Sequence, residues 1–143
     1  MEIYLDNSAT TKPYQEVVDK MVLALTTQYG NPSSIHKKGI EVEREIKEIR
    51  RNIARSLGAK ENEIYFTSGG TECNNTIIRS VARLNKKTKN HIISTVIEHP
   101  SVLDTLKDLE SEGFEVTYLP VDKDGKISIE DLKNAIKKET ILV

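Results

Sequence analysis

From residue 63 onward, short apolar segments alternate with amphipathic helical patterns, and this alternation constrains the fold more than any other feature of the chain. Apolar runs predict four strands, at residues 64–67, 91–96, 114–119 and 140–143. Helical spacing predicts a helix after each of the first three strands. Strands separated by helices are typical of an α/β fold, so we expect a mostly parallel sheet with covering helices.

The three helices between these strands have recognisable starts and apolar faces. The first begins at Thr71, the second has Pro100 at its first position, and Ser128 caps the third. Their predicted inward-facing residues are Ile77, Val81 and Leu84; then Val102, Leu103, Leu106 and Leu109; then Ile129, Leu132 and Ile136.

The first 60 residues have a different pattern, because two helical stretches follow one another there with no strand between them. One helix follows Pro13 and stops before Gly30, and the other runs from Ile40 to Leu57 and ends at Gly58. We therefore expect residues 1–143 to form a single α/β region, with a helical segment at 1–60 and βα units at 61–143. Because the chain ends in an apolar run at residues 141–143, we also expect it to be the truncated amino-terminal part of a longer protein.

Composition excludes several classes of function. The 143 residues contain 21 Lys and Arg against 22 Asp and Glu, a balance that gives no field for binding nucleic acid. Cys73 is the only cysteine, so an intrachain disulfide is excluded and nothing favours an oxidising compartment. No stretch approaches the roughly 20 apolar residues of a membrane helix, and no signal peptide opens the chain. We expect a cytoplasmic protein with neither nucleic acid nor membrane as a partner.

A glycine pair lies where the first predicted strand meets the first predicted helix, in the sequence Ser-Gly-Gly-Thr-Glu at residues 68–72. Glycines allow an anion to approach the backbone, the N–H groups of a first helical turn point at it, and the hydroxyl of Thr71 adds a donor. This arrangement predicts a phosphate cradle. The alternative is a plain strand-to-helix turn with Thr71 as the N-cap.

His99 occupies the equivalent junction one βα unit later, directly before Pro100. Ligands of open α/β sheets bind at the carboxyl ends of the strands, so the cradle and this imidazole are expected to share one edge. The adjacent helix N-terminus disfavours an imidazolium and leaves a neutral ring suited to stacking or proton transfer. The alternative is a solvent-facing capping histidine. His91, which opens a strand, and His36, in a loop, are weaker candidates.

Three further features are interpreted as structural. Residues 122–127 resemble a calcium loop, but Pro120 stands at the first ligand position and Asp131 at the bidentate one, so we predict a polar turn and no metal site. Cys73 is predicted to be a small core residue facing the same way as Ile77. The lysine-rich residues 86–89 are predicted to form a solvated loop.

Four motifs in order resemble the cysteine desulfurases of the NifS/IscS group, within the class-V aminotransferases. They are IYLDNSATT at residues 3–11, YGNPSSIH at 29–36, YFTSGGTECNN at 65–75 and IEHPSVLDT at 97–105. The resemblance covers essentially the whole chain and aligns it with about the first third of the family. It implies the amino-terminal part of the large domain of a fold-type I transferase that depends on pyridoxal 5′-phosphate.

The resemblance also implies roles for individual residues. Gly70 and Thr71 match the family's phosphate-binding pair, and His99 matches the histidine that stacks on the pyridine ring and assists proton transfer, so it is both a catalytic and a cofactor-binding candidate. Residues 6–11 and 31–36 match stretches near the active site and the dimer contact. The complete enzyme would take sulfur from L-cysteine, leave alanine and an enzyme persulfide, act as a homodimer, and pass sulfur to an iron–sulfur scaffold or another acceptor protein.

Several parts of the family pattern have no counterpart in these 143 residues. The resemblance places the Schiff-base lysine, the persulfide-forming cysteine, the aspartate on the pyridinium nitrogen and the arginine on the substrate carboxylate in later segments. Cys73 stands where the family carries a small residue, so it is not the sulfur-accepting nucleophile. Two alternatives remain open at this point: a selenocysteine lyase or related fold-type I lyase, and an inactive stand-alone binding or dimerisation module.

Overall fold

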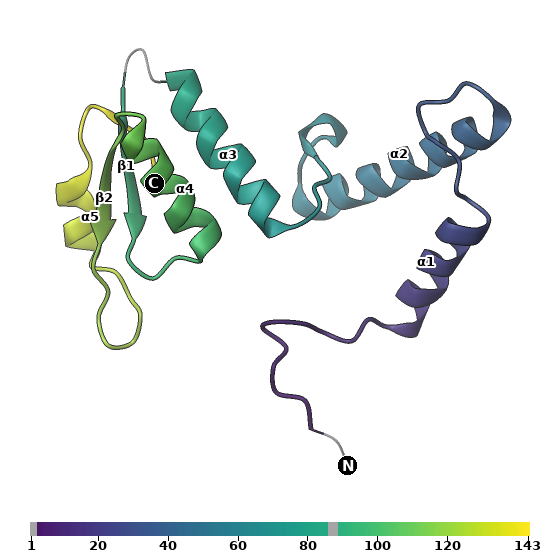
Figure 1. Cartoon of the computed structure of the whole chain (residues 1–143), viewed down its shortest axis with the longest axis horizontal. Coiled ribbons are helices and arrows are strands. Elements are labelled where there is room, and N and C mark those ends of the chain that lie inside the picture. The colour runs from purple at the N-terminus through teal and green to yellow at the C-terminus, as the bar shows by residue number, and fades with distance from the viewer. Residues whose placement is uncertain (1–2, 86–88) are drawn as a thin grey trace. The chain divides into compact units, whose positions relative to one another are not determined.

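The computed structural model describes residues 3–85 and 89–143 and divides into two compact units, Met1–Tyr65 and Phe66–Val143 (Figure 1). Of the predicted lysine-rich loop at residues 86–89, the first three residues lie outside the described part of the chain.

The first unit is helical, as the sequence predicts for this part of the chain. It contains α1 (Gln15–Thr26), α2 (Lys37–Leu57) and the short 3₁₀ helix η1 (Glu61–Glu63). Helix α2 begins three residues earlier than predicted, because the His36 side chain accepts a hydrogen bond from the Gly39 N–H (3.3 Å) and caps the helix there. It ends as predicted at Gly58, whose φ of 65° is left-handed and favours glycine.

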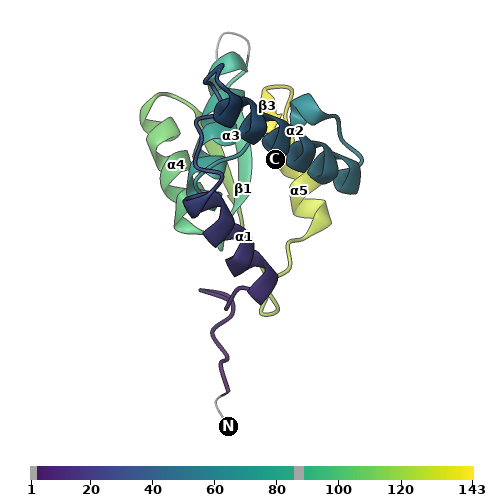
Figure 2. The ribbon, with the colours of Figure 1, turned by 90° about the vertical axis from the view of Figure 1, so that its right-hand side faces the viewer.

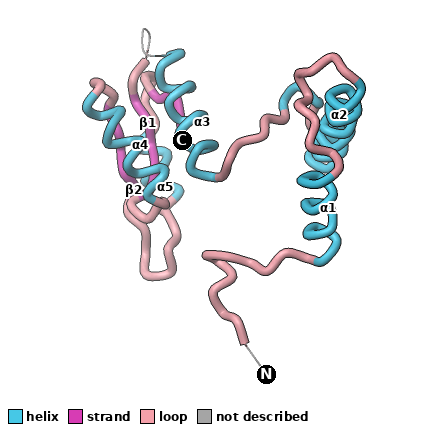
Figure 3. Tube along the Cα trace, turned by 45° about the vertical axis from the view of Figure 1, so that its right-hand side comes forward, coloured by secondary structure: helices cyan, strands magenta, loops and turns pink. Residues whose placement is uncertain are grey.

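The second unit is a three-stranded parallel sheet with helices on it. Its elements are α3 (Gly70–Asn85), β1 (His91–Thr95), α4 (Pro100–Ser111), β2 (Glu115–Leu119), α5 (Ile129–Ala135) and β3 (Thr140–Leu142). The strand order is β2-β1-β3, and β1 pairs in parallel with both neighbours. Figure 2 shows α4 and α5 on opposite sides of β1, and Figure 3 shows the three helices grouped around the strands. The predicted α/β fold class is therefore confirmed.

The core of this unit lies between α3, α4 and the sheet. It consists of Ile78, Ala82, Ile92, Leu106, Leu109 and Phe114. The inward face predicted for α3 is wrong by one position: Ile77 and Leu84 are 52% and 84% exposed, whereas Ile78 and Ala82 are buried. Two apolar stripes one residue apart run along this helix, and packing selects the one with the small Ala82, which lets the helix approach its neighbours closely.

The strand predicted at residues 64–67 is not formed. Ile64 has an extended backbone (φ −98°, ψ 123°), but its carbonyl accepts a hydrogen bond from the guanidinium of Arg50 on α2. Extended dihedrals alone make no strand, because a strand also needs a neighbour to complete its ladder. The later predicted strands are present, with boundaries that differ by one residue at one end.

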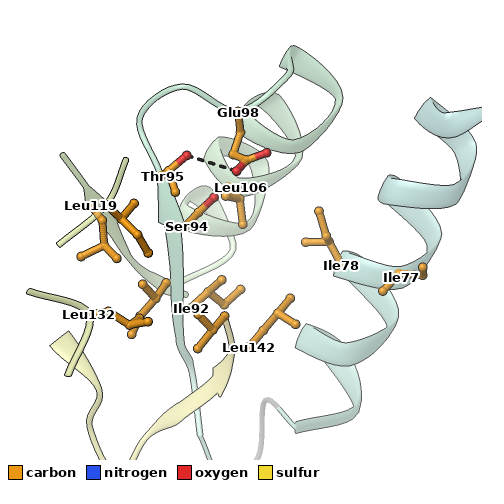
Figure 4. Close-up of a pocket in the computed structure, with 13 residues that line it drawn as sticks. Ile77, Ile78, Ile92, Ser94, Thr95, Glu98, Leu106, Leu119, Leu132 and Leu142 are labelled. Atoms are coloured by element: carbon orange, nitrogen blue, oxygen red, sulfur yellow. Dashed lines mark hydrogen bonds between the residues drawn. The ribbon is translucent and has the colours of Figure 1, made fainter. Parts of the chain in front are cut away.

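One apolar hollow lies within the second unit. Side chains of the sheet, α3, α4 and α5 line it, among them Ile78, Ile92, Leu106, Leu132 and Leu142 (Figure 4). At its rim the Thr95 hydroxyl donates to the Glu98 carboxylate at 3.1 Å. Within residues 3–85 and 89–143, no helix combines the length and the hydropathy needed to cross a membrane.

Candidate functional site

The starts of α3 and α4 come together at a shallow polar depression. Thr71, Asn75, His99, Ser101 and Thr105 are among the residues that line it. Both helices begin beyond the carboxyl end of β1 in the sheet, which is where α/β folds bind ligands. Two predicted site residues, Thr71 and His99, are thus brought to one place. Gly70 precedes Thr71 and does not line the depression itself.

The predicted cradle has open space above its glycines. Helix α3 begins at Gly70, and the first N–H to bond back into the turn is that of Cys73, which donates to the Gly69 carbonyl at 3.1 Å. The N–H groups before it have no partner within the helix. A Cβ placed on Gly69 or Gly70 would meet no other atom of the chain within 4 Å. No contact described within the chain requires these two glycines. The open space and the free donors would fit a phosphate group, and the role of cradle stays a prediction.

Thr71 is the second residue of α3, so the alternative in which it is the N-cap is wrong. Its hydroxyl is on an exposed residue at the positive end of the helix. This position suits a hydrogen bond to a bound anion better than a bond within the turn.

Glu72, which is not among the predicted site residues, orders the loop before the predicted cradle. Its carboxylate accepts hydrogen bonds from the backbone N–H and the hydroxyl of Ser68, at 2.6 and 2.7 Å. The backbone bond is the main cause of the lowered pKa of Glu72, with the hydroxyl second. The Ser-x-x-x-Glu spacing is a capping box lengthened by one residue, and it was the available signal.

His99 is the N-cap of α4. Its Nδ1 accepts a hydrogen bond from the Ser101 N–H at 3.0 Å and lies 2.9 Å from the Ser101 hydroxyl. A backbone N–H can only donate, so Nδ1 carries the lone pair and a neutral ring carries its proton on Nε2. His99 therefore caps α4, as the alternative interpretation predicts. The cap uses only Nδ1, so it does not exclude a role for Nε2 or for the ring face.

Behind these residues lies a polar network that sequence reasoning missed. Asn74 donates to the Ser101 hydroxyl at 2.9 Å, and Asn75 donates to the Thr71 carbonyl at 3.0 Å. The Thr105 hydroxyl donates to the Asn75 side-chain oxygen at 2.8 Å. The bonds from Asn74 to Ser101 and from Thr105 to Asn75 join α3 to α4 between residues more than 25 positions apart in sequence, so only the packing of the two helices reveals the network.

The other two histidines lie outside the depression. His91 is fully buried, with Nδ1 2.8 Å from the Thr140 hydroxyl and Nε2 2.8 Å from the Thr117 hydroxyl. Burial lowers the pKa of His91, and the positive charge of Lys137 lowers it further. His36 caps α2, as described above. Both are structural in this arrangement.

Two other features were interpreted as structural. In the turn at residues 122–127, the Asp122 carboxylate accepts backbone N–H bonds from Asp124 (2.8 Å) and Lys126 (2.9 Å), so the predicted polar turn is confirmed. The core position predicted for Cys73 is wrong: the residue is half-buried, and Ile77, with which it was aligned, is exposed. No group of three or more His, Cys, Asp or Glu side chains suited to a metal ion occurs among the described residues.

The motif segments of the first unit form local turns. In residues 6–11 the N–H groups of Ala9 and Thr10 donate to the Asp6 carbonyl, and in residues 31–36 the Asn31 side chain accepts from the Ser33 N–H at 2.9 Å. Their roles near an active site or a dimer contact stay predictions.

Comparison with known proteins identifies the family. Residues 3–143 match the aminotransferase class-V family. The chain belongs to this family. Among curated members, the chain is 48% identical over 142 residues to the cysteine desulfurase IscS of Clostridium botulinum, covering 99% of this chain and 36% of that protein. It is 51% identical over 142 residues to a mitochondrial cysteine desulfurase of Candida albicans, covering 99% of this chain and 29% of that protein.

The solved structure of a NifS-like protein matches with a TM-score of 0.94 at 41% identity, covering 98% of this chain and 38% of that one. The fold is therefore that of the class-V enzymes. The chain spans about a third of the length of these relatives.

Proposed function

We propose that this chain is the amino-terminal portion of a pyridoxal-phosphate-dependent cysteine desulfurase, which takes sulfur from L-cysteine and leaves alanine and an enzyme persulfide. The observation that carries the proposal is that Thr71, at the start of α3, and His99, at the start of α4, line one depression. The relatives' shared name, cysteine desulfurase, supports this activity over a selenocysteine lyase or an inactive binding or dimerisation module.

The chain's own residues suit the two ends of the cofactor. Gly70 would let the phosphate approach the backbone, and the first-turn N–H groups of α3 together with the Thr71 hydroxyl would donate to it. Pyridoxal phosphate, when bound, supplies an electron sink for the substrate's reacting carbon.

His99 would act with its ring face and its Nε2. The ring would stack on the pyridine and orient it, while Nδ1 stays fixed by the cap of α4. Nε2 would then give or take a proton at the substrate, as a positioned general acid or base. Cys73 has no part in this scheme, because it is a half-buried residue within α3.

The complete enzyme is proposed to be a cytoplasmic homodimer that hands sulfur to an iron–sulfur scaffold or another acceptor protein. A single, unpaired Cys73 is compatible with a reducing compartment. The chain would form one α/β region of the large domain, helical up to residue 60 and built of βα units after it.

The test uses the full-length protein with pyridoxal phosphate bound and compares His99→Asn with His99→Ala. Asparagine is a good N-cap residue, so His99→Asn removes the imidazole and keeps the cap, whereas His99→Ala removes both. We expect His99→Asn to retain the melting temperature, to change the cofactor's absorption spectrum, and to lower turnover of L-cysteine by roughly 10²-fold or more.

The two substitutions separate chemistry from capping. His99→Ala should show the same catalytic loss plus a stability loss of about 0.5–2 kcal/mol from the missing cap. Wild-type turnover and spectrum in His99→Asn would show that the residue only caps the helix, and would overturn its proposed role in the chemistry. A wild-type full-length protein that does not turn over L-cysteine would overturn the proposed function.

A further inference from the structure

Two consecutive asparagines of α3 reach across to the first turn of α4. Asn74 is half-buried and donates from Nδ2 to the hydroxyl of Ser101, a buried residue. Asn75 donates to the main-chain oxygens of Thr71 (3.0 Å) and Ser101 (3.5 Å). The helix that carries Thr71 is thereby tied to the helix that carries His99, through side chains that contribute neither cradle donors nor the ring.

The direction of the hydrogen bonds along Asn74, Ser101 and His99 is fixed by the donor chemistry. The Nδ2 group of an amide only donates, so the Ser101 oxygen is the acceptor of the 2.9 Å bond from Asn74. The single hydroxyl proton of Ser101 is then free to point at His99 Nδ1, 2.9 Å away. Nδ1 therefore accepts two bonds, one from the Ser101 hydroxyl and one from the Ser101 N–H.

We propose that Asn74 is a positioning residue: through the Ser101 hydroxyl it holds the His99 imidazole in one orientation, while the Ser101 N–H keeps the ring in its Nε2–H tautomer. This inference rests on the proposed role of His99 and adds a residue that holds the His99 ring in position for that role. A histidine whose second nitrogen is held by a hydrogen-bond partner has a defined tautomer and ring orientation, and loss of such a partner at metal-bound histidines typically costs 10- to 100-fold.

The polarity of the amide makes the proposal testable with a nearly isosteric change. In Asn74→Asp the carboxylate accepts, so it draws the Ser101 proton toward itself and away from His99 Nδ1. Ser101→Ala removes the hydroxyl that transmits this effect and leaves the Ser101 backbone N–H in place. Thr76→Ala is a matched control, because Thr76 is an exposed residue of the same helix and does not line the depression.

The experiment uses the full-length, cofactor-bound protein and measures kcat, KM for L-cysteine, melting temperature and the ¹⁵N resonances of the His99 ring, assigned by difference from His99→Asn. We expect Asn74→Asp to lower kcat by about 10-fold or more. KM and melting temperature should change little, and the Nδ1 resonance should shift, because Nδ1 loses the bond from the Ser101 hydroxyl and keeps the one from the Ser101 N–H. Thr76→Ala should match wild type in all four measurements.

The double variant Asn74→Asp with Ser101→Ala provides the second check. Without the Ser101 hydroxyl, the change from a hydrogen-bond donor to an acceptor at residue 74 cannot affect the His99 ring. The double variant should therefore be no slower than Ser101→Ala alone. Additive losses in this cycle would overturn the inference, because Asn74 would then act by another path.

The failures of this inference and of the proposed function are distinguishable. Wild-type kcat and ring resonances in Asn74→Asp, combined with the loss of turnover in His99→Asn, would overturn the positioning role and leave the proposed function standing. A drop in melting temperature with unchanged ring resonances would also overturn it, since Asn74 would then be only structural. Normal turnover of L-cysteine in His99→Asn would overturn the proposed role of His99, and this inference with it. The proposed function itself would be overturned by a wild-type full-length protein that releases no sulfide from L-cysteine.

Discussion

At Gly39, the turn at residues 31–34 and the start of α2 come so close that no side chain fits. A Cβ there would overlap the carbonyl oxygen of Ser34 and lie 2.6 Å from that of Asn31. At Gly70 a Cβ would meet nothing of the chain within 4 Å. Gly39 is therefore required by the packing of the fold, whereas no described contact requires Gly70, and the proposed approach of the cofactor phosphate would account for it.

A paired substitution tests this difference. Gly39→Ala forces backbone atoms apart and should destabilise the full-length protein by about 1–3 kcal/mol or more. Gly70→Ala should keep the melting temperature of the cofactor-free protein and weaken binding of pyridoxal phosphate. Thermal melts and cofactor titrations of both variants give the answer. Equal cofactor affinity in Gly70→Ala and wild type would show that the space above the glycine is not used.

At Thr71 a single substitution can test the contribution of the hydroxyl to cofactor binding. Thr71→Val keeps the shape of the side chain and deletes one charge-assisted hydrogen bond to the phosphate, so cofactor binding should weaken by about 1.5–3 kcal/mol. Thr71→Ser keeps the hydroxyl and is the control, with an affinity expected near that of wild type. Titration of cofactor-free protein measures both. A folded Thr71→Val variant that binds as tightly as Thr71→Ser would remove Thr71 from the site.

Among the elements, the central strand β1 is linked to both neighbouring strands by side-chain hydrogen bonds of one histidine. The buried ring of His91 lies within hydrogen-bond distance of Thr140 on β3 and Thr117 on β2. Each contact needs one ring nitrogen, and the neutral imidazole supplies one donor and one acceptor. A charged ring would have to donate to both hydroxyls in a site where burial disfavours charge.

Stability should therefore depend on pH through His91. The pKa of His91 is lowered in the folded protein, by burial first and by Lys137 second, against smaller opposing effects of Glu115 and Glu139. The unfolded chain thus binds the proton more readily, so the stabilisation is fully present above the ordinary histidine pKa of about 6.5 and falls as the pH drops below it. Melting temperatures between about pH 8 and pH 5 should fall less steeply in His91→Gln than in wild type. Parallel curves would contradict this role.

The elements also show how far the sequence determines this structure. Alternation of apolar runs and helical stripes was enough to predict β1, α4, β2 and α5, together with the positions of Thr71 and His99 at helix starts. The face of α3 was wrong because Ile77 and Ile78 are adjacent and apolar, and only packing distinguishes them. Asn74 and Ser101 were missed for the same reason, since their contact depends on how α3 packs on α4.

At the scale of the whole molecule, the two units differ in how much they bury. Among the described residues of the first unit only Gly39 and Ala54 are buried, and α1 has no buried residue at all. Its apolar residues Met21 and Leu25 are 57% and 75% exposed. The second unit has a core of its own around Ile92 and Leu106. Helices of this length are marginal in water without packing, so α1 depends on apolar surface that the described residues of the first unit do not supply.

The last prediction concerns the 143-residue polypeptide on its own, compared with the full-length protein. We expect the amide protons of α1 (Gln15–Thr26) to exchange rapidly in the short polypeptide, because α1 has no buried residue to hold it in the first unit, while those of β1 (His91–Thr95) stay protected by the core. We also expect no sulfide release from L-cysteine above a cofactor-only blank, because the family resemblance places the cofactor-binding lysine and the sulfur-accepting cysteine in later segments. In the full-length protein, α1 should become protected and sulfide release should appear. Strong protection of α1 in the short polypeptide would show that the first unit is stable by itself, and sulfide release by the short polypeptide would show that its own residues suffice for the reaction.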